Sequence, residues 1–157
     1  MQGFTSGLFD RLDDDSTAAP CSKEQARSRA VSHAMRSVTR DLQALLNTRS
    51  ALSPAALATY PAVSNSTVNY GLTDFAGMCM SSDTDRQEIC KAVRLAIERH
   101  EPRLHQVTVV LQASQGAINR VDFVITARLK NAPQSGPLSF NAVFCPSLQQ
   151  YSIAAIT

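Results

Sequence analysis

The sequence lacks several features that mark large classes of protein. No apolar run approaches the roughly 18 residues that a membrane-spanning helix needs. The first residues, Met1 to Phe4, show neither the basic start nor the apolar stretch of a secretion signal. The four cysteines form no Cys-x-x-Cys pair. We therefore expect a cytoplasmic chain that does not insert into a membrane and has no disulfide framework.

An excess of charge of one sign is also missing. The 157 residues carry 15 Lys and Arg against 13 Asp and Glu, for a formal net charge of +2. This balance gives no electrostatic reason to expect a nucleic-acid partner. With 44% hydrophobic and 18% charged residues, the composition is that of a folded domain rather than of a disordered segment.

The signatures of common enzyme and metal sites are absent as well. There is no glycine-rich phosphate loop and no Gly-x-Ser-x-Gly turn. Cys79, Cys90 and His100 are a conceivable metal-ligand set, but their spacing is wider than that of structural zinc sites. We favour small buried cysteines instead. The sequence thus predicts neither a metal nor another cofactor.

One pair of carboxylates leaves an enzymatic alternative open. Glu98 and Glu101 could act as the two acids of a peptidoglycan hydrolase, a lysozyme-like activity. They lie three residues apart at a predicted helix end, beside Arg99 and Arg103. Neighbouring arginines favour the ionised carboxylate, whereas a general acid must be protonated. We therefore expect a protein that is not an enzyme, and keep the hydrolase as the second hypothesis.

Helical periodicity fills the first two-thirds of the chain. Apolar residues from Val31 to Leu46 recur at steps of three and four, which predicts a helix over residues 23–48. A helical turn should follow Pro54, and a second long helix should start after Asp83 as its N-cap and end before Pro102. The polar face of the first helix carries a row of arginines, which is either a solvated face or a docking face for acidic partners: Arg29, Arg36, Arg40 and Arg49.

The segment before this first helix predicts an N-terminal arm over residues 1–21. Leu8, Phe9 and Leu12 are apolar, and an acidic run of three aspartates follows them. The arm is either a frayed terminus or a short helix that docks on a partner.

After residue 105 the periodicity changes from 3.6 to 2, which predicts strands. The expected strands cover about 106–111, 120–130, 138–144 and 151–155, and short turns separate them. Four such strands form an antiparallel sheet. We therefore predict an α+β fold in which two main helices pack on one face of a four-stranded sheet, as a single domain over residues 22–157.

The last part of the chain has no charge at all. From Asn131 to Thr157 there is no Lys, Arg, Asp or Glu, although this segment covers two predicted strands. Exposed edge strands are normally protected by charge or proline. Either neighbouring strands of this chain bury the segment, or a partner covers it by adding a strand to the sheet.

The junction between the second helix and the first strand is the other informative feature. Glu101 and Arg103 flank Pro102, which restricts the backbone around it. A planar guanidinium beside a carboxylate is suited to bidentate pairing, either within the chain or across an interface.

Five stretches together resemble the TssE family, the small wedge subunits of the type VI secretion baseplate. This family is homologous to the baseplate wedge protein of contractile-tailed phages. The stretches occur in the family's order, although Thr73 stands where the family usually has proline. They are Gly7–Leu12, Ser37–Arg49, Val68–Leu72, Glu101–Leu104 and Val121–Leu129.

The resemblance implies a structural part, without catalysis, that joins the baseplate wedge to the contractile sheath and initiates sheath assembly at the inner membrane. It implies that Glu101, Pro102 and Arg103 bind the wedge subunits TssF and TssG, with TssK as a further candidate. It also implies that the C-terminal strands pair with the sheath proteins TssB and TssC, while Leu8, Phe9 and Leu12 anchor the arm. The sheath-binding residues expected on these strands are Phe140, Ala142, Phe144, Tyr151 and Ile153.

Overall fold

The computed structural model describes residues 23–52, 54–75, 78, 82–112, 121–130, 136–145, 147–148 and 150–156. Its helices are α2 (Lys23–Asn47), α3 (Pro54–Thr59) and α4 (Asp83–His100), with the 3₁₀ helices η1 (Pro61–Asn65) and η2 (Thr67–Asn69) after α3. Its strands are β1 (Leu104–Gln112), β2 (Val121–Leu129), β3 (Leu138–Cys145) and β4 (Gln150–Ile156).

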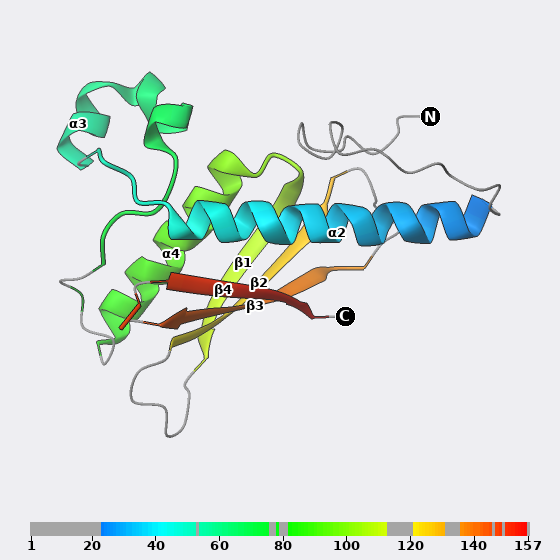
Figure 1. Cartoon of the computed structure of the whole chain (residues 1–157). Helices are drawn as coiled ribbons and strands as arrows, with labels where there is room; N and C mark the ends of the chain where they lie inside the picture. The colour runs from blue at the N-terminus through cyan, green and yellow to red at the C-terminus, as the bar shows by residue number, and fades with distance from the viewer. Residues whose placement is uncertain are drawn as a thin grey trace.

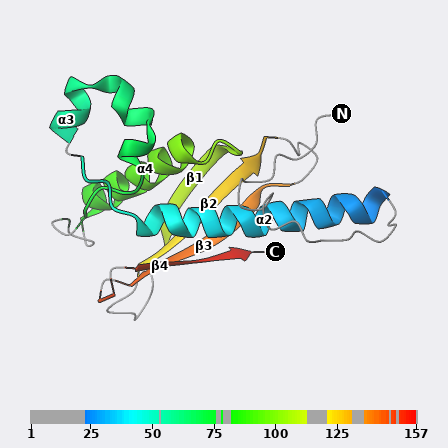
Figure 2. The ribbon, with the colours of Figure 1, turned by 45° about the horizontal axis from the view of Figure 1, so that its top comes forward.

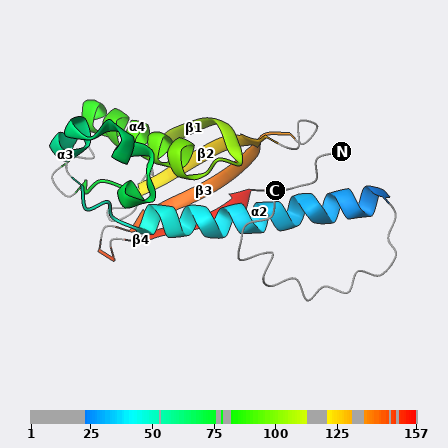
Figure 3. The same ribbon diagram turned by 90° about the horizontal axis from the view of Figure 1, so that it is seen from above.

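The molecule has two layers (Figure 1). One layer is a four-stranded antiparallel sheet in the order β1-β2-β3-β4. The other layer is formed by α4, which packs against β1, and α2, which packs against β4. Figure 3 shows the two helices above opposite margins of the sheet, with α3 and the 3₁₀ turns at one end of the molecule. The predicted α+β fold is confirmed.

The apolar side of α2 faces the sheet, as its periodicity predicts. Val38 and Leu42 are fully buried, and Leu45 and Leu46 are nearly so. Burying each such side chain contributes roughly 1.5–3 kcal/mol. The helix ends at Asn47, one residue before the predicted end.

The second long helix differs from the prediction at its start. Ser82 is the N-cap of α4, and its hydroxyl accepts a hydrogen bond from the Asp85 amide at 3.4 Å. Asp83 is the first helical residue instead, where its negative charge faces the positive end of the helix dipole. Serine and aspartate are comparably good caps, so the composition alone does not distinguish the two positions.

The strand alternation is confirmed, with one irregularity that the sequence did not reveal. The register between β1 and β2 shifts between His105 and Thr108. Gln106 lies within this bulge with φ at +53°, in the left-handed region. Leu104 and Val107 are three residues apart and would face opposite sides of a regular strand, yet both are buried. The extra residue of the bulge lets both reach the core.

The core lies between the helices and the sheet. Its largest fully buried side chains come from α2, α4 and the two central strands: Val38, Leu42, Leu45, Ile89, Val93, Ile97, Phe123, Ile125 and Phe140. Seen from the angle of Figure 2, the strands run obliquely beneath both helices. In the described part of the chain no helix has the length and apolar character to span a membrane.

Candidate functional site

The turn that joins α4 to β1 places Glu101, Pro102 and Arg103 beside α2. Glu101 ends α4 as its C-cap, and its amide donates to the Ile97 carbonyl at 2.9 Å. The Leu104 amide then donates to the Glu101 carbonyl at 3.1 Å, which closes the turn. Pro102 is exposed at the tip, whereas Glu101 is only 4% exposed.

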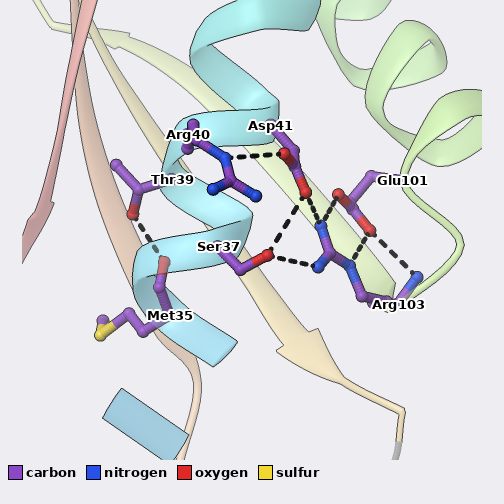
Figure 4. A network of polar contacts seen from close by, with 7 residues as sticks. All are labelled: Met35, Ser37, Thr39, Arg40, Asp41, Glu101 and Arg103. Carbon is purple, nitrogen blue, oxygen red and sulfur yellow. Dashed lines mark hydrogen bonds and ion pairs between the residues drawn. The ribbon is translucent and has the colours of Figure 1, made fainter. Parts of the chain in front are cut away.

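Arg103 binds three side chains at once (Figure 4). Its Nε and Nη2 donate to the two carboxylate oxygens of Glu101, each at 2.6 Å. Nη2 also donates to Asp41 Oδ2 at 2.5 Å, and Nη1 donates to Ser37 Oγ at 2.9 Å. We call these four residues, Ser37, Asp41, Glu101 and Arg103, the Arg103 network.

The Arg103 network is partly shielded from water. The side chains of Glu101, Arg103 and Asp41 are 6%, 19% and 35% exposed. The hydrogen bonds to Glu101 raise the pKa of Arg103 above its ordinary value, and Asp41 acts in the same direction. The guanidinium therefore remains charged, and it pairs with two carboxylates from separate elements. The pairing of Glu101 with Arg103 is thus made within the chain.

A second group of contacts fixes the far end of α2 to the loop after η2. Gly71 has φ at +112°, and a Cβ atom there would collide with the Thr48 carbonyl. The Leu72 amide donates to that same carbonyl at 2.8 Å, and the Ser50 amide donates to the Leu72 carbonyl at 2.8 Å. This close backbone approach requires glycine at position 71.

Asn69 connects the same loop to its surroundings. Its Oδ1 accepts from Ser50 Oγ at 2.8 Å, and its Nδ2 donates to the Ser64 carbonyl at 2.9 Å. His100 Nε2 lies 3.1 Å from the Asn69 carbonyl oxygen, and the His100 ring meets Tyr70 edge-on at 5.3 Å. Burial lowers the pKa of His100. The C-terminal end of α4 is thereby fixed to η2.

The third feature is the outer edge of β4. Asn47, the last residue of α2, donates from Nδ2 to the Tyr151 carbonyl at 2.9 Å and accepts from the Tyr151 amide at 2.8 Å. Both backbone groups of Tyr151 therefore point away from β3. Backbone direction alternates along an antiparallel strand, so those of Ile153 and Ala155 point the same way. Within the described residues, nothing is hydrogen-bonded to these two residues at this edge.

The side chains of the predicted sheath-binding residues are part of the hydrophobic core or pack against it. Phe140, Ala142, Tyr151 and Ile153 are buried, and Phe144 packs against that core. Phe140, Ala142 and Phe144 also belong to β3, which is paired on both sides. Burial raises the pKa of Tyr151 to about 12. Of these two strands, β4 is the one at an edge of the sheet, so a partner strand could pair with the sheet at β4 but not at β3.

The remaining predicted residues are separated or lie elsewhere. Glu98 is exposed on α4, whereas the Glu101 carboxylate has both oxygens occupied by Arg103. Such a carboxylate is poorly placed to protonate a leaving group. Leu8, Phe9, Leu12 and Cys79 lie outside the described residues. Among those that are described, no group of His, Cys, Asp and Glu could hold a metal ion.

Sequence reasoning missed Ser37, Asp41 and Asn47 as site residues. Ser37 and Asp41 are four residues apart, and this spacing places both on one face of a helix. A serine and a carboxylate at the border of the apolar stripe of a helix could have indicated a polar partner from another element. Asn47 gave no such signal, because its partner is the backbone of a strand 104 residues away.

Comparison with known proteins agrees with this architecture. A solved chain of "The baseplate complex from the type VI secretion system" aligns with a TM-score of 0.50 at 15% identity, over 80% of this chain and 96% of that one. At this identity the likeness shows a shared fold. No curated protein is similar enough in sequence to count as a match.

The family comparison covers most of the described elements. The family model for "Baseplate wedge protein gp25" matches residues 32–134, from α2 through β2. The matched range includes the complete Arg103 network and Gly71. It is more than half of the chain, and it confirms at the family level the resemblance found in the sequence. The chain therefore belongs to the family of the baseplate wedge protein gp25.

Proposed function

We propose that this chain is a structural subunit of a type VI secretion baseplate that joins the wedge to the contractile sheath and initiates sheath assembly. Membership of the baseplate wedge family supports the structural role. The observation that carries the joining role is the edge of β4, which has neither charge nor proline from Gln150 to Ile156. The assembly would lie in the cytoplasm, at the inner membrane.

The wedge side of this proposal rests on the α4–β1 turn. The Arg103 network fixes the turn against α2, and Pro102 stands exposed at its tip. A rigid exposed turn loses little conformational entropy when a partner binds it. TssF and TssG are the proposed partners at this turn, with TssK as a further candidate.

A test of the wedge contact needs a variant that leaves the Arg103 network intact. Arg103→Glu would place a third carboxylate beside Glu101 and Asp41, so it would destabilise the fold as well as any interface. Pro102→Asp changes the exposed tip instead. We expect it to reduce co-purification of TssF and TssG at least tenfold, with unchanged thermal unfolding.

Pro137→Asp is the matched control, because Pro137 is also exposed but lies before β3. It should leave co-purification unchanged. Recovery of TssF and TssG at wild-type levels with Pro102→Asp would refute the turn as the wedge contact.

The sheath side rests on strand addition at β4. Ala155→Pro removes the outward amide of Ala155, and proline is tolerated on an edge strand where its nitrogen faces outward. We expect this variant to bind the wedge subunits normally and to fail in starting TssB–TssC sheaths, as followed by electron microscopy of sheath lengths and numbers. Normal sheaths from a folded Ala155→Pro variant would refute joining through this edge.

A further inference from the structure

A groove runs between α2 and the end of β4. It has a volume of about 790 Å³, and we call it the α2–β4 groove. Sites that bind small molecules are roughly 300–1,000 Å³ in size, so the groove is large enough to hold several side chains of a partner. Its described lining consists of Ser32, Met35, Arg36, Thr39, Arg40, Gln43 and Ala155.

The contacts of α2 with β4 explain where the groove opens. At the C-terminal end of α2, the two hydrogen bonds between Asn47 and Tyr151 hold the helix against the strand edge. The groove is lined farther back on the helix, between residues 32 and 43, and at Ala155 on the strand. Figures 1 and 3 show α2 extending past the C-terminal end of β4. Asn47 therefore occupies the outer edge of β4 at Tyr151, whereas the edge at Ala155 lies along the groove.

The lining of the groove favours an acidic occupant. Met35 and Ala155 provide apolar surface, while Arg36 and Arg40 are exposed cations one helical turn apart. Nε of Arg40 also pairs with Asp41 at 3.5 Å, which leaves the rest of its exposed guanidinium at the groove. No acidic side chain is among the described residues of the lining. Guanidinium groups bind carboxylates in a bidentate manner, and partner specificity follows charge complementarity.

The strand edge beside the groove favours an extended occupant. Ile153 and Ala155 each direct one amide and one carbonyl outward, so an added strand could form up to four hydrogen bonds with them. The preceding outward residue, Tyr151, is already bonded to Asn47. An added strand therefore cannot extend past Ile153 toward Tyr151 unless it displaces Asn47.

We propose that the α2–β4 groove binds an extended acidic segment of a partner protein, which pairs with β4 from Ile153 to Ala155, and that Asn47 sets the register by occupying Tyr151. Alternate side chains of this segment pack on Met35 and Ala155, and its carboxylates bind Arg36 and Arg40. This inference rests on the proposed joining of the sheath at β4. Beyond that joining role, it specifies that the partner strand is acidic and that its pairing with β4 ends at Ile153.

The test uses two synthetic octapeptides of alternating residues, one of valine and glutamate and the other of valine and lysine, both acetylated and amidated. Each is titrated into the ¹⁵N-labelled full-length chain, and amide exchange is followed by NMR. We expect the glutamate peptide to slow exchange at the Ile153 and Ala155 amides at least tenfold and to bind at least tenfold more tightly than the lysine peptide.

Two variants separate the charge and register parts of the proposal. Arg36→Glu leaves one cation and one carboxylate in the lining and should abolish the preference between the peptides, while Arg94→Glu, an exposed charge reversal on α4, should leave it unchanged. Asn47→Ala should extend the protection by the glutamate peptide to the Tyr151 amide. Equal binding of both peptides, protection elsewhere in the sheet, or no binding at millimolar concentration would overturn the proposal.

Failure of this inference can be told apart from failure of the proposed function. If neither peptide binds while the chain still starts sheaths and Ala155→Pro does not, the acidic segment is wrong and the joining role stands. If the glutamate peptide protects Ile153 and Ala155 but Ala155→Pro starts sheaths normally, the groove is confirmed as a strand-binding site and the joining role is refuted.

Discussion

At the scale of single residues, Arg103 links two helices and a turn through side-chain hydrogen bonds. Its guanidinium holds Glu101 in the α4–β1 turn and Ser37 and Asp41 on α2. Sequence reasoning identified Glu101 and Arg103 as a pair, because their residue types and the proline between them suit bidentate pairing. It left open whether the two side chains pair within the chain or across an interface. It did not find Asp41 as a further partner of Arg103, because Asp41 is 62 positions away in the sequence.

Removal of this side chain should destabilise the whole domain. In Arg103→Ala the buried Glu101 carboxylate loses its counter-ion, and breaking such a pair costs about 3–5 kcal/mol. We expect a loss near the lower value, because Asp41 is partly exposed. Urea unfolding monitored by circular dichroism measures it. Arg94→Ala, on the exposed side of α4, should change the unfolding free energy by less than about 0.5 kcal/mol.

Two glycines offer a matched pair of substitutions. Gly71→Ala places a Cβ against the Thr48 carbonyl at a positive φ, whereas a Cβ added at Gly136 would meet no atom within 4 Å. Strain of this kind costs roughly 1–3 kcal/mol. Thermal and urea unfolding should show that loss for Gly71→Ala and no loss for Gly136→Ala. Equal stability of the two variants would contradict the close approach at Thr48.

At the scale of elements, α2 is the part that both candidate interfaces share. Its middle turns hold the α4–β1 turn through Asp41, and its last residue holds β4 through Asn47. Both long helices and all four strands were predicted from periodicity, because each buries a regular apolar side. The 3₁₀ turns after α3 and the bulge in β1 were not, since they depend on contacts with distant elements such as Asn69 with Ser50.

The attachment of α4 to η2 should make stability depend on pH. The folded-state pKa of His100 is lowered by burial, so the unfolded state, with a pKa near 6.5, takes up the proton more readily. Stability is therefore lost as the pH falls from about 6.5 toward the lower folded-state value. The charged neighbour Arg99 acts in the same direction.

This dependence can be isolated by comparing two histidines. His100→Gln should lose less unfolding free energy between pH 7.5 and pH 5 than the wild type, as measured by urea unfolding at each pH. His33→Gln changes an exposed residue of α2 and should keep the wild-type dependence. Identical pH dependence in the wild type and His100→Gln would show that this contact does not couple to folding.

At the scale of the whole molecule, the last strand is part of the core. Tyr151 and Ile153 are each 7% exposed, and Asn47 is bonded to the backbone of Tyr151. Loss of these contacts should cost more than about 4 kcal/mol, a large part of the 5–15 kcal/mol that stabilises a typical domain. Deletion of β4 is therefore unsuitable as a test of sheath joining alone.

We expect a chain that ends at Leu148 to lose cooperative thermal unfolding and to elute as expanded or aggregated species in size-exclusion chromatography. A chain that ends at Ile156 keeps all of β4 and should behave as the full-length protein does. Cooperative unfolding of the shorter chain near the wild-type temperature would show that β4 is dispensable for the core.

The two hydrogen bonds from Asn47 to Tyr151 have a mechanical consequence. A force applied to β4 from outside the sheet is borne by β3 and also by α2, because Asn47 fastens the helix directly to that strand. From α2 the tension passes through Asp41 to Arg103 and so to the opposite margin of the molecule. When a partner pulls on β4, this path lets the domain carry the load across its width without stretching the sheet alone.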